Sequence, residues 1–119
     1  MKKDNLIAEK TKNFAIQIIH LYLSNERKEY VLSKQVLRSG TSIGANVKEA
    51  TQAQSKADFI SKMSIALKEA SETEYWLELL KETSFLNEKQ FNEINKENES
   101  IIKIITKIIK TSKTTPTKN

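Results

Sequence analysis

The sequence of 119 residues carries 20 basic and 15 acidic side chains, a net charge of +5. This length is enough for one domain with a hydrophobic core of its own. Cysteine is absent, which excludes a disulfide framework, a thiol nucleophile and a thiolate metal site. No apolar run approaches the roughly 20 residues of a membrane span, and Asp4 and Glu9 interrupt any signal-peptide pattern. We expect a soluble, cytoplasmic protein.

Four segments have hydrophobic residues at three- and four-residue steps, the period of an amphipathic helix. They are residues 4–24, 33–52, 56–83 and 88–112, with Asp4 as one candidate cap and Ser55 or Lys56 at another helix start. The chain has only two glycines and one proline, the residues that most disfavour helix, so its composition favours helix throughout. Short connections predict an all-α, antiparallel up-down-up-down four-helix bundle. We predict a bundle domain over residues 1–112 and a disordered polar tail over 113–119.

The second segment carries two different stripes along residues 35–50. One is apolar, and the other consists of Gln35, Arg38, Ser42, Asn46 and Glu49. A solvent-facing stripe is ordinarily a mixture of Lys and Glu, whereas this one offers a guanidinium, a hydroxyl, amides and a carboxylate. Gly40 and Gly44 each cost about 1 kcal/mol relative to alanine inside a helix. Close packing of another backbone is the expected compensation.

The third predicted helix is apolar over much of its circumference. Beside its core stripe, further hydrophobic residues widen the apolar surface on both sides. No helix of a four-helix bundle is central, so a helix with a second apolar face needs a second partner. We therefore predict an oligomer whose interface contains Ile65, Trp76 and Leu79.

Two carboxylates of this helix, Glu69 and Glu72, project close to its apolar residues. Burying an unpaired carboxylate costs several kcal/mol, so each needs a partner or a shifted pKa. We predict a polar cluster, either within the bundle or between subunits, of Arg38, Ser42, Asn46, Glu49, Glu69 and Glu72. Its expected role is to specify helix register or subunit contact. A ligand site and a catalytic site are the alternatives.

The sequence offers no pattern for a metal site or a catalytic centre. A di-iron bundle uses Glu-x-x-His on two of its helices, whereas the single histidine, His20, has Gln17 three positions before it. No histidine is placed to activate Ser42 as a nucleophile. We expect no metal, no cofactor and no enzymatic activity.

Basic residues concentrate toward the end of the sequence. From residue 103 onward there are five lysines and no acid. Lys103, Lys107 and Lys110 fall on the outward face of the fourth predicted helix. Such a row is a candidate surface for RNA or DNA, whose phosphates attract basic side chains. The alternative is a solubilising helix end.

Two stretches carry a resemblance to a known family. They are residues 39–50, of the pattern SxTSIGANVKEA, and residues 57–80, ADFISKMSIALKEASETEYWLELL. From about residue 10 to residue 109 the chain resembles the bacterial 23S ribosomal RNA intervening-sequence proteins. The resemblance is densest at Arg38, Ser42, Ile43, Asn46, Glu49, Ala50, Phe59, Ala66, Glu69 and Glu72. Many members have Glu-Gly where this chain has Glu49-Ala50.

The resemblance implies an antiparallel four-helix bundle that assembles as a ring-like homopentamer. Some members are encoded in insertions within ribosomal RNA genes, which supplies the family name. A similar bundle is the accessory protein of diversity-generating retroelements, where a basic pentamer binds nucleic acid and a reverse transcriptase. These expectations predict a non-catalytic, homo-oligomeric bundle that binds RNA or DNA through basic surface residues. The alternative is a scaffold that docks a protein partner and does not touch nucleic acid.

Overall fold

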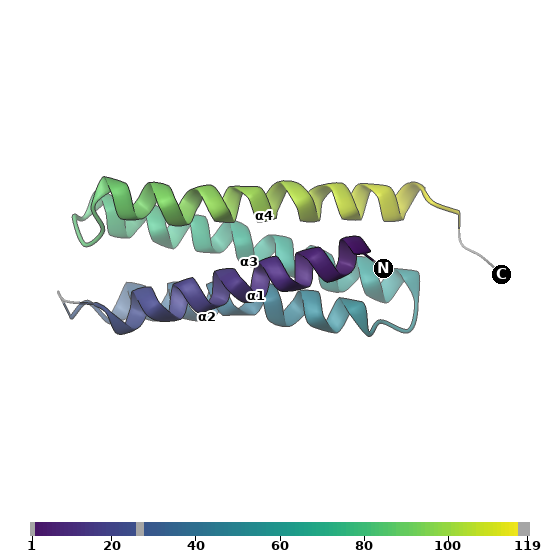
Figure 1. Cartoon of the computed structure of the whole chain (residues 1–119), viewed down its shortest axis with the longest axis horizontal. Helices are drawn as coiled ribbons and strands as arrows, with labels where there is room; N and C mark the ends of the chain where they lie inside the picture. Colours follow the sequence, from purple (N-terminus) through teal and green to yellow (C-terminus); the bar gives the residue numbers. More distant parts are fainter. Residues whose placement is uncertain (1, 26–27, 117–119) are drawn as a thin grey trace.

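The structure, a computed structural model that describes residues 2–25 and 28–116, consists of four long helices (Figure 1). They are α1 (Lys2–Leu23), α2 (Val31–Thr51), α3 (Lys56–Glu82) and α4 (Glu88–Thr114). Each helix packs against the next along the chain, and α4 packs back against α1. In the described part of the chain, the diagonal pairs α1–α3 and α2–α4 make no close backbone contact. This arrangement confirms the predicted all-α four-helix bundle with up-down-up-down order.

Local hydrogen bonds define the starts of α3 and α4. Ser55 precedes α3, and its hydroxyl accepts a hydrogen bond from the Asp58 backbone N–H at 3.0 Å. Asn87 and Gln90 form a capping box at the start of α4, in which each side chain accepts a hydrogen bond from the other's backbone N–H. Such caps satisfy N–H groups that have no partner inside the helix. The predicted helix start at Ser55 or Lys56 is therefore confirmed.

Three predicted helix boundaries are wrong, each by two residues. α1 begins at Lys2, so the predicted cap residue Asp4 lies inside its first turn. α2 begins at Val31, before the predicted start at residue 33. α4 continues two residues beyond the predicted boundary at residue 112. The helix stops because Pro116 disfavours helical backbone in the residue before it, and Thr115 is extended, with φ -80° and ψ 128°. The end of the predicted tail, residues 117–119, lies outside the described residues.

The start of α2 is capped by a residue outside the helix. The Glu29 carboxylate accepts hydrogen bonds from the backbone N–H groups of Val31, Leu32 and Ser33 at 2.9–3.0 Å. Burial acts to raise the pKa of Glu29, but these donors outweigh it, and the pKa lies below its ordinary value. The ionised carboxylate therefore stabilises the start of α2, where the helix dipole also favours a negative charge.

Acidification is expected to weaken this cap. Because the pKa of Glu29 is lower in the folded than in the unfolded state, its contribution is complete above the unfolded-state pKa and is lost as pH falls through the folded-state pKa. Glu29→Gln should lower the free energy of unfolding at neutral pH by about 0.5–1 kcal/mol. At a pH below the folded-state pKa the two proteins should converge. Urea unfolding at both pH values measures this, and a difference that does not change with pH would rule out the ionised cap.

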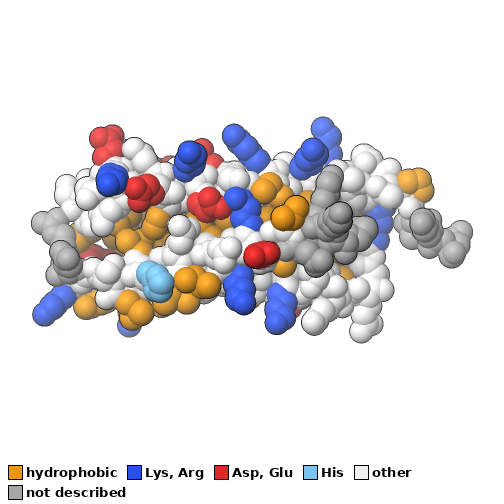
Figure 2. Space-filling model, viewed as in Figure 1, with side chains coloured by type: hydrophobic (Ala, Val, Ile, Leu, Met, Phe, Trp, Pro, Cys, Tyr) orange, Lys and Arg blue, Asp and Glu red, His pale blue; other side chains and the backbone are white. Residues whose placement is uncertain are grey.

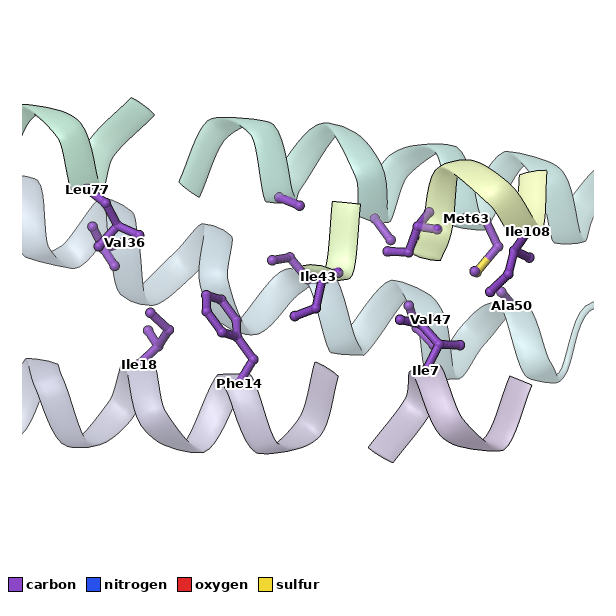
Figure 3. Close-up of a cluster of buried hydrophobic side chains, with 14 of the residues drawn as sticks. Ile7, Phe14, Ile18, Val36, Ile43, Val47, Ala50, Met63, Leu77 and Ile108 are labelled. Carbon is purple, nitrogen blue, oxygen red and sulfur yellow. The ribbon is translucent and has the colours of Figure 1, made fainter. Parts of the chain in front are cut away.

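All four helices contribute side chains to one hydrophobic core. The labelled residues that meet in the interior are Ile7, Phe14 and Ile18 of α1, Val36, Ile43, Val47 and Ala50 of α2, Met63 and Leu77 of α3, and Ile108 of α4 (Figure 3). Each of them is at most 9% exposed. Removing this apolar surface from water is the main favourable contribution to folding.

α1 and α2 approach each other closely at the two glycines of α2. A Cβ atom on Gly44 would lie 3.3 Å from the backbone oxygen of Thr11, and a Cβ atom on Gly40 would lie 3.0 Å from the Ile18 side chain. Larger side chains at either position would push α1 away. The predicted close packing at these glycines is confirmed, and the partner is α1 of the same chain.

Several polar side chains are buried between the helices. Ser39 of α2 and Thr73 of α3 share a hydroxyl–hydroxyl hydrogen bond of 2.8 Å. Asn98 of α4 is fully buried, and its side-chain amide donates to the backbone carbonyl of Ala70 on α3 at 2.8 Å. A buried polar group without a partner is costly. These bonds therefore favour one relative height for the helices that they join.

Candidate functional site

Arg38 of α2 lies between two carboxylates of α3. Its Nη1 atom is 3.1 Å from Glu69 Oε2, its Nη2 atom pairs with Glu72, and its Nε–H donates to Gln35 at 3.1 Å. The Arg38 side chain is 49% exposed and that of Glu69 is 13% exposed. The structure thus brings Arg38, Glu69 and Glu72 together within one chain. At this exposure, each ion pair contributes about 1 kcal/mol or less to stability.

Trp76 extends this contact along α3. Its indole N–H donates to the Glu72 carboxylate at 3.1 Å. Its ring meets the Tyr75 ring edge to face, with the centroids 5.3 Å apart. The sequence predicts that Glu72 projects close to the apolar residues of α3, and the indole hydrogen bond links it to Trp76, which is predicted for an interface. The four-residue spacing is the signal for that link, because it places both side chains on one helix face.

The other three residues of the predicted polar cluster take different partners. The Ser42 hydroxyl donates to the backbone carbonyl of Arg38 at 2.6 Å, and the Asn46 amide donates to that of Ser42 at 2.9 Å. Glu49 pairs with Lys62 of α3 at 3.1 Å. Short polar side chains on a helix readily bond the carbonyl one turn earlier. In place of a six-residue cluster, the structure therefore forms a three-residue one, and its structural role stays a prediction.

Apolar side chains remain accessible on two helices that lie diagonally across the bundle. Three residues of α3 are predicted for an interface. Ile65 is exposed, and Trp76 and Leu79 are half-buried. On α1, a second stripe is exposed and consists of Ile16, Ile19 and Leu23. The sequence analysis did not single out this α1 stripe, although its three- and four-residue spacing is visible beside the core stripe. The oligomer interface stays a prediction.

The outward face of α4 is basic along its C-terminal half. Lys103, Lys107 and Lys110 are all exposed. Figure 2 shows basic side chains along the edge formed by α4, with acidic side chains gathered toward the other end of that helix. Lys96 falls on the same helix face, seven residues before Lys103. No acid follows Lys103 in the sequence, so Lys107 and Lys110 have no carboxylate of their own helix within one turn.

The part of the chain that the structure describes has neither a metal cluster nor a membrane span. There, no group of three or more histidine, aspartate or glutamate side chains could hold a metal ion. None of the described helices combines the length and apolar character that a membrane span requires. His20 is an exposed residue of α1.

A comparison with known proteins establishes the family. A family model described as 23S rRNA-intervening sequence protein matches residues 3–107. The chain belongs to this family. The bundle is similar to the crystal structure, at 1.70 Å resolution, of a protein with unknown function from the S23 ribosomal protein family of Bacteroides thetaiotaomicron VPI-5482. The two chains are 57% identical with a TM-score of 0.88, over 91% of this chain and 98% of the other.

Membership of the 23S rRNA-intervening sequence protein family confirms the resemblance that rests on residues 39–50 and 57–80. A search of curated proteins finds no match. The matched segment contains Arg38, Glu69 and Glu72 and ends at Lys107, so Lys110 lies beyond it. The lysine row of α4 therefore extends past the end of the family match.

Proposed function

We propose that this member of the 23S rRNA-intervening sequence protein family is a non-catalytic, cytoplasmic bundle that self-associates and binds RNA or DNA through phosphates. The observation that carries the proposal is the exposed row of Lys103, Lys107 and Lys110 on α4. Lysine contacts to phosphates position a protein on nucleic acid without reading its bases. Binding is therefore expected to tolerate many sequences.

The spacing of the row suits a chain of phosphates. Lys103 and Lys110 are seven residues apart, which is about 10 Å along a helix, and Lys107 lies between them. Lys96 lengthens the row to about 21 Å. Each phosphate that a lysine neutralises releases counterions, so the affinity should fall steeply as salt rises.

Self-association is supported by the two accessible apolar faces. The α3 face around Ile65 and the α1 face around Ile19 belong to diagonal helices, so they point to opposite sides of the bundle. Contact of the α3 face of one subunit with the α1 face of the next is head-to-tail, and such contacts form a ring when the rotation between neighbouring subunits closes. A homopentameric ring, the assembly implied by the family resemblance, is the form that we propose. The ring would present several lysine rows to one nucleic acid and so raise the avidity of binding.

Reversal of the charges on α4 tests the proposal. With Lys103→Glu, Lys107→Glu and Lys110→Glu combined, the affinity for a fluorescein-labelled single-stranded RNA should fall about 100-fold at low salt. The slope of log K against log salt should become shallower by about 2, since each lost phosphate contact on a single strand removes about 0.7. Fluorescence anisotropy over a salt series measures both quantities.

The matched control reverses three exposed lysines on other helices, Lys34 and Lys48 of α2 and Lys68 of α3. It changes the net charge by the same amount, so its affinity should stay close to that of the parent. Equal losses in the two triple variants would show that general charge, and not the α4 row, attracts the RNA. A parent protein without measurable, salt-dependent binding would overturn the proposal.

A protein-docking scaffold is the second candidate function, and the exposed α1 stripe of Ile16, Ile19 and Leu23 favours it. An amphipathic partner helix would bind such a stripe through apolar contacts. Capture of a protein that is insensitive to salt, is lost with Ile19→Glu and survives the charge reversal on α4 would support this function over nucleic-acid binding.

A further inference from the structure

A groove lies between the first half of α1 and the second half of α4, next to the start of α3. Its volume is about 830 Å³, which lies within the range of small-molecule sites. The apolar part of its lining consists of Leu6, Ile7, Phe59, Ile104 and Ile108. Figure 2 shows hydrophobic side chains in the seam between α1 and α4. Ile7 and Ile108 are themselves buried, so the groove has a hydrophobic floor.

The charges around the groove are unevenly placed. Lys10 of α1 and Glu97 of α4 form an ion pair that joins the two helices, so these charges neutralise each other. Glu9 lies beside Lys10 on the same helix. Lys56 and Lys107 line the groove toward the C-terminal end of α4. The Lys56 ammonium contacts the backbone carbonyl oxygen of Thr115, a neutral group, so its charge is not cancelled there.

We infer that this groove binds an amphiphile with a single alkyl chain and an anionic head group. The alkyl chain lies against Phe59, Ile104 and Ile108, and the head group lies between Lys56 and Lys107. From Glu97 to the end of the lining at Ser112, α4 advances about 22 Å, which gives an extended chain room to lie along the helix. The ion pair of Lys10 and Glu97 bounds the other end.

The charge pattern selects the anionic head group. At the end formed by Lys56 and Lys107, a cationic amphiphile would place its charge beside two lysines. At the other end it would meet Glu97, which is already paired with Lys10, and Glu9, which lies next to Lys10 on α1. A neutral apolar ligand would fill the lining but leave both lysines without an anionic partner. The site shares Lys107 with the proposed nucleic-acid surface, whereas Lys56 belongs to the groove alone. Lys103 and Lys110 do not line the groove.

Calorimetric titration of the full chain with sodium laurate, below its micelle concentration, tests the inference. Laurate should bind at one site per chain, and the affinity should rise about fourfold for each methylene added between octanoate and laurate. Dodecyltrimethylammonium should bind at least about tenfold more weakly, since it loses a charge-assisted contact. Equal affinities for the cationic and anionic probes, or no laurate binding, would overturn the inference.

Variants locate the site. Lys56→Glu should weaken laurate binding about tenfold and leave RNA binding unchanged, whereas Lys103→Glu with Lys110→Glu should do the reverse. Ile104→Trp should block the groove by filling it, with the helical circular dichroism retained. Laurate binding that survives both Lys56→Glu and Ile104→Trp would overturn the assignment. A change of oligomeric state in these variants without laurate binding by the parent would assign the groove to a second copy of the chain instead.

Discussion

Phe14→Ala is expected to lower the free energy of unfolding by about 3–5 kcal/mol, the usual cost of removing a large buried aromatic side chain. Phe14 is 0% exposed and points from α1 into the interior of the bundle (Figure 3). The surrounding helices are held by their own packing and cannot close the cavity completely. Urea denaturation followed by circular dichroism measures the loss.

The matched control for Phe14→Ala is Ile16→Ala, which lies on the same helix. Ile16 is 42% exposed in the single chain, so at a protein concentration low enough to separate the subunits its truncation should cost less than about 1 kcal/mol. Similar losses in the two variants would mean either that Phe14 is not in the core or that Ile16 is buried by a partner. Dilution distinguishes these explanations, because only a loss caused by a subunit interface depends on protein concentration.

Asn98→Asp is expected to lower the free energy of unfolding by a similar amount, because it would bury a charge. Asn98 is fully buried, and its amide N–H donates to the Ala70 carbonyl. Among the described atoms, its side-chain oxygen has no hydrogen-bond partner. An ionised aspartate would place an uncompensated charge next to that carbonyl, which should cost about 3–5 kcal/mol at neutral pH.

The cost of Asn98→Asp should depend on pH with a definite sign. Burial raises the folded-state pKa of the new carboxyl above its unfolded value of about 3.9. Relative to the parent, the variant should be most stable below about pH 4 and lose stability as pH rises toward the folded-state pKa. Asn98→Leu is the control, since it removes the hydrogen bond without adding a titratable group, so its effect on the free energy of unfolding should not change with pH. A loss for Asn98→Asp that is equal at all pH values would exclude the charge as its cause.

The periodicity of hydrophobic residues was sufficient to predict the bundle, because four amphipathic helices with short connections have few ways to bury their apolar faces. The same periodicity contained signals that were not used. Thr11, Thr73 and Asn98 occupy positions that continue the apolar stripes, with neighbours three or four residues away. A polar residue at such a position predicts a buried hydrogen bond. The stop of α4 before Pro116 could likewise have been read from the sequence.

The polar cluster shows what the sequence could not predict. A helical projection places Arg38, Ser42 and Asn46 on one face, but it does not give the distance that each side chain reaches. Arg38 is long enough to contact Glu69 and Glu72 on α3, whereas Ser42 and Asn46 bond carbonyls of α2. The choice between a local backbone partner and a distant carboxylate depends on the separation of the helices, which only the packed structure defines.

The stability predictions test the fold, whereas the proposed function rests on the basic face of α4 and the apolar faces of α1 and α3. Native mass spectrometry of protein purified without nuclease tests both the basic and the apolar surfaces in a single measurement. We predict an oligomer, five chains in the proposed ring, that carries nucleic acid. The combined Lys103→Glu, Lys107→Glu and Lys110→Glu protein should keep the oligomer and lose the nucleic acid. A single chain free of nucleic acid would contradict the account.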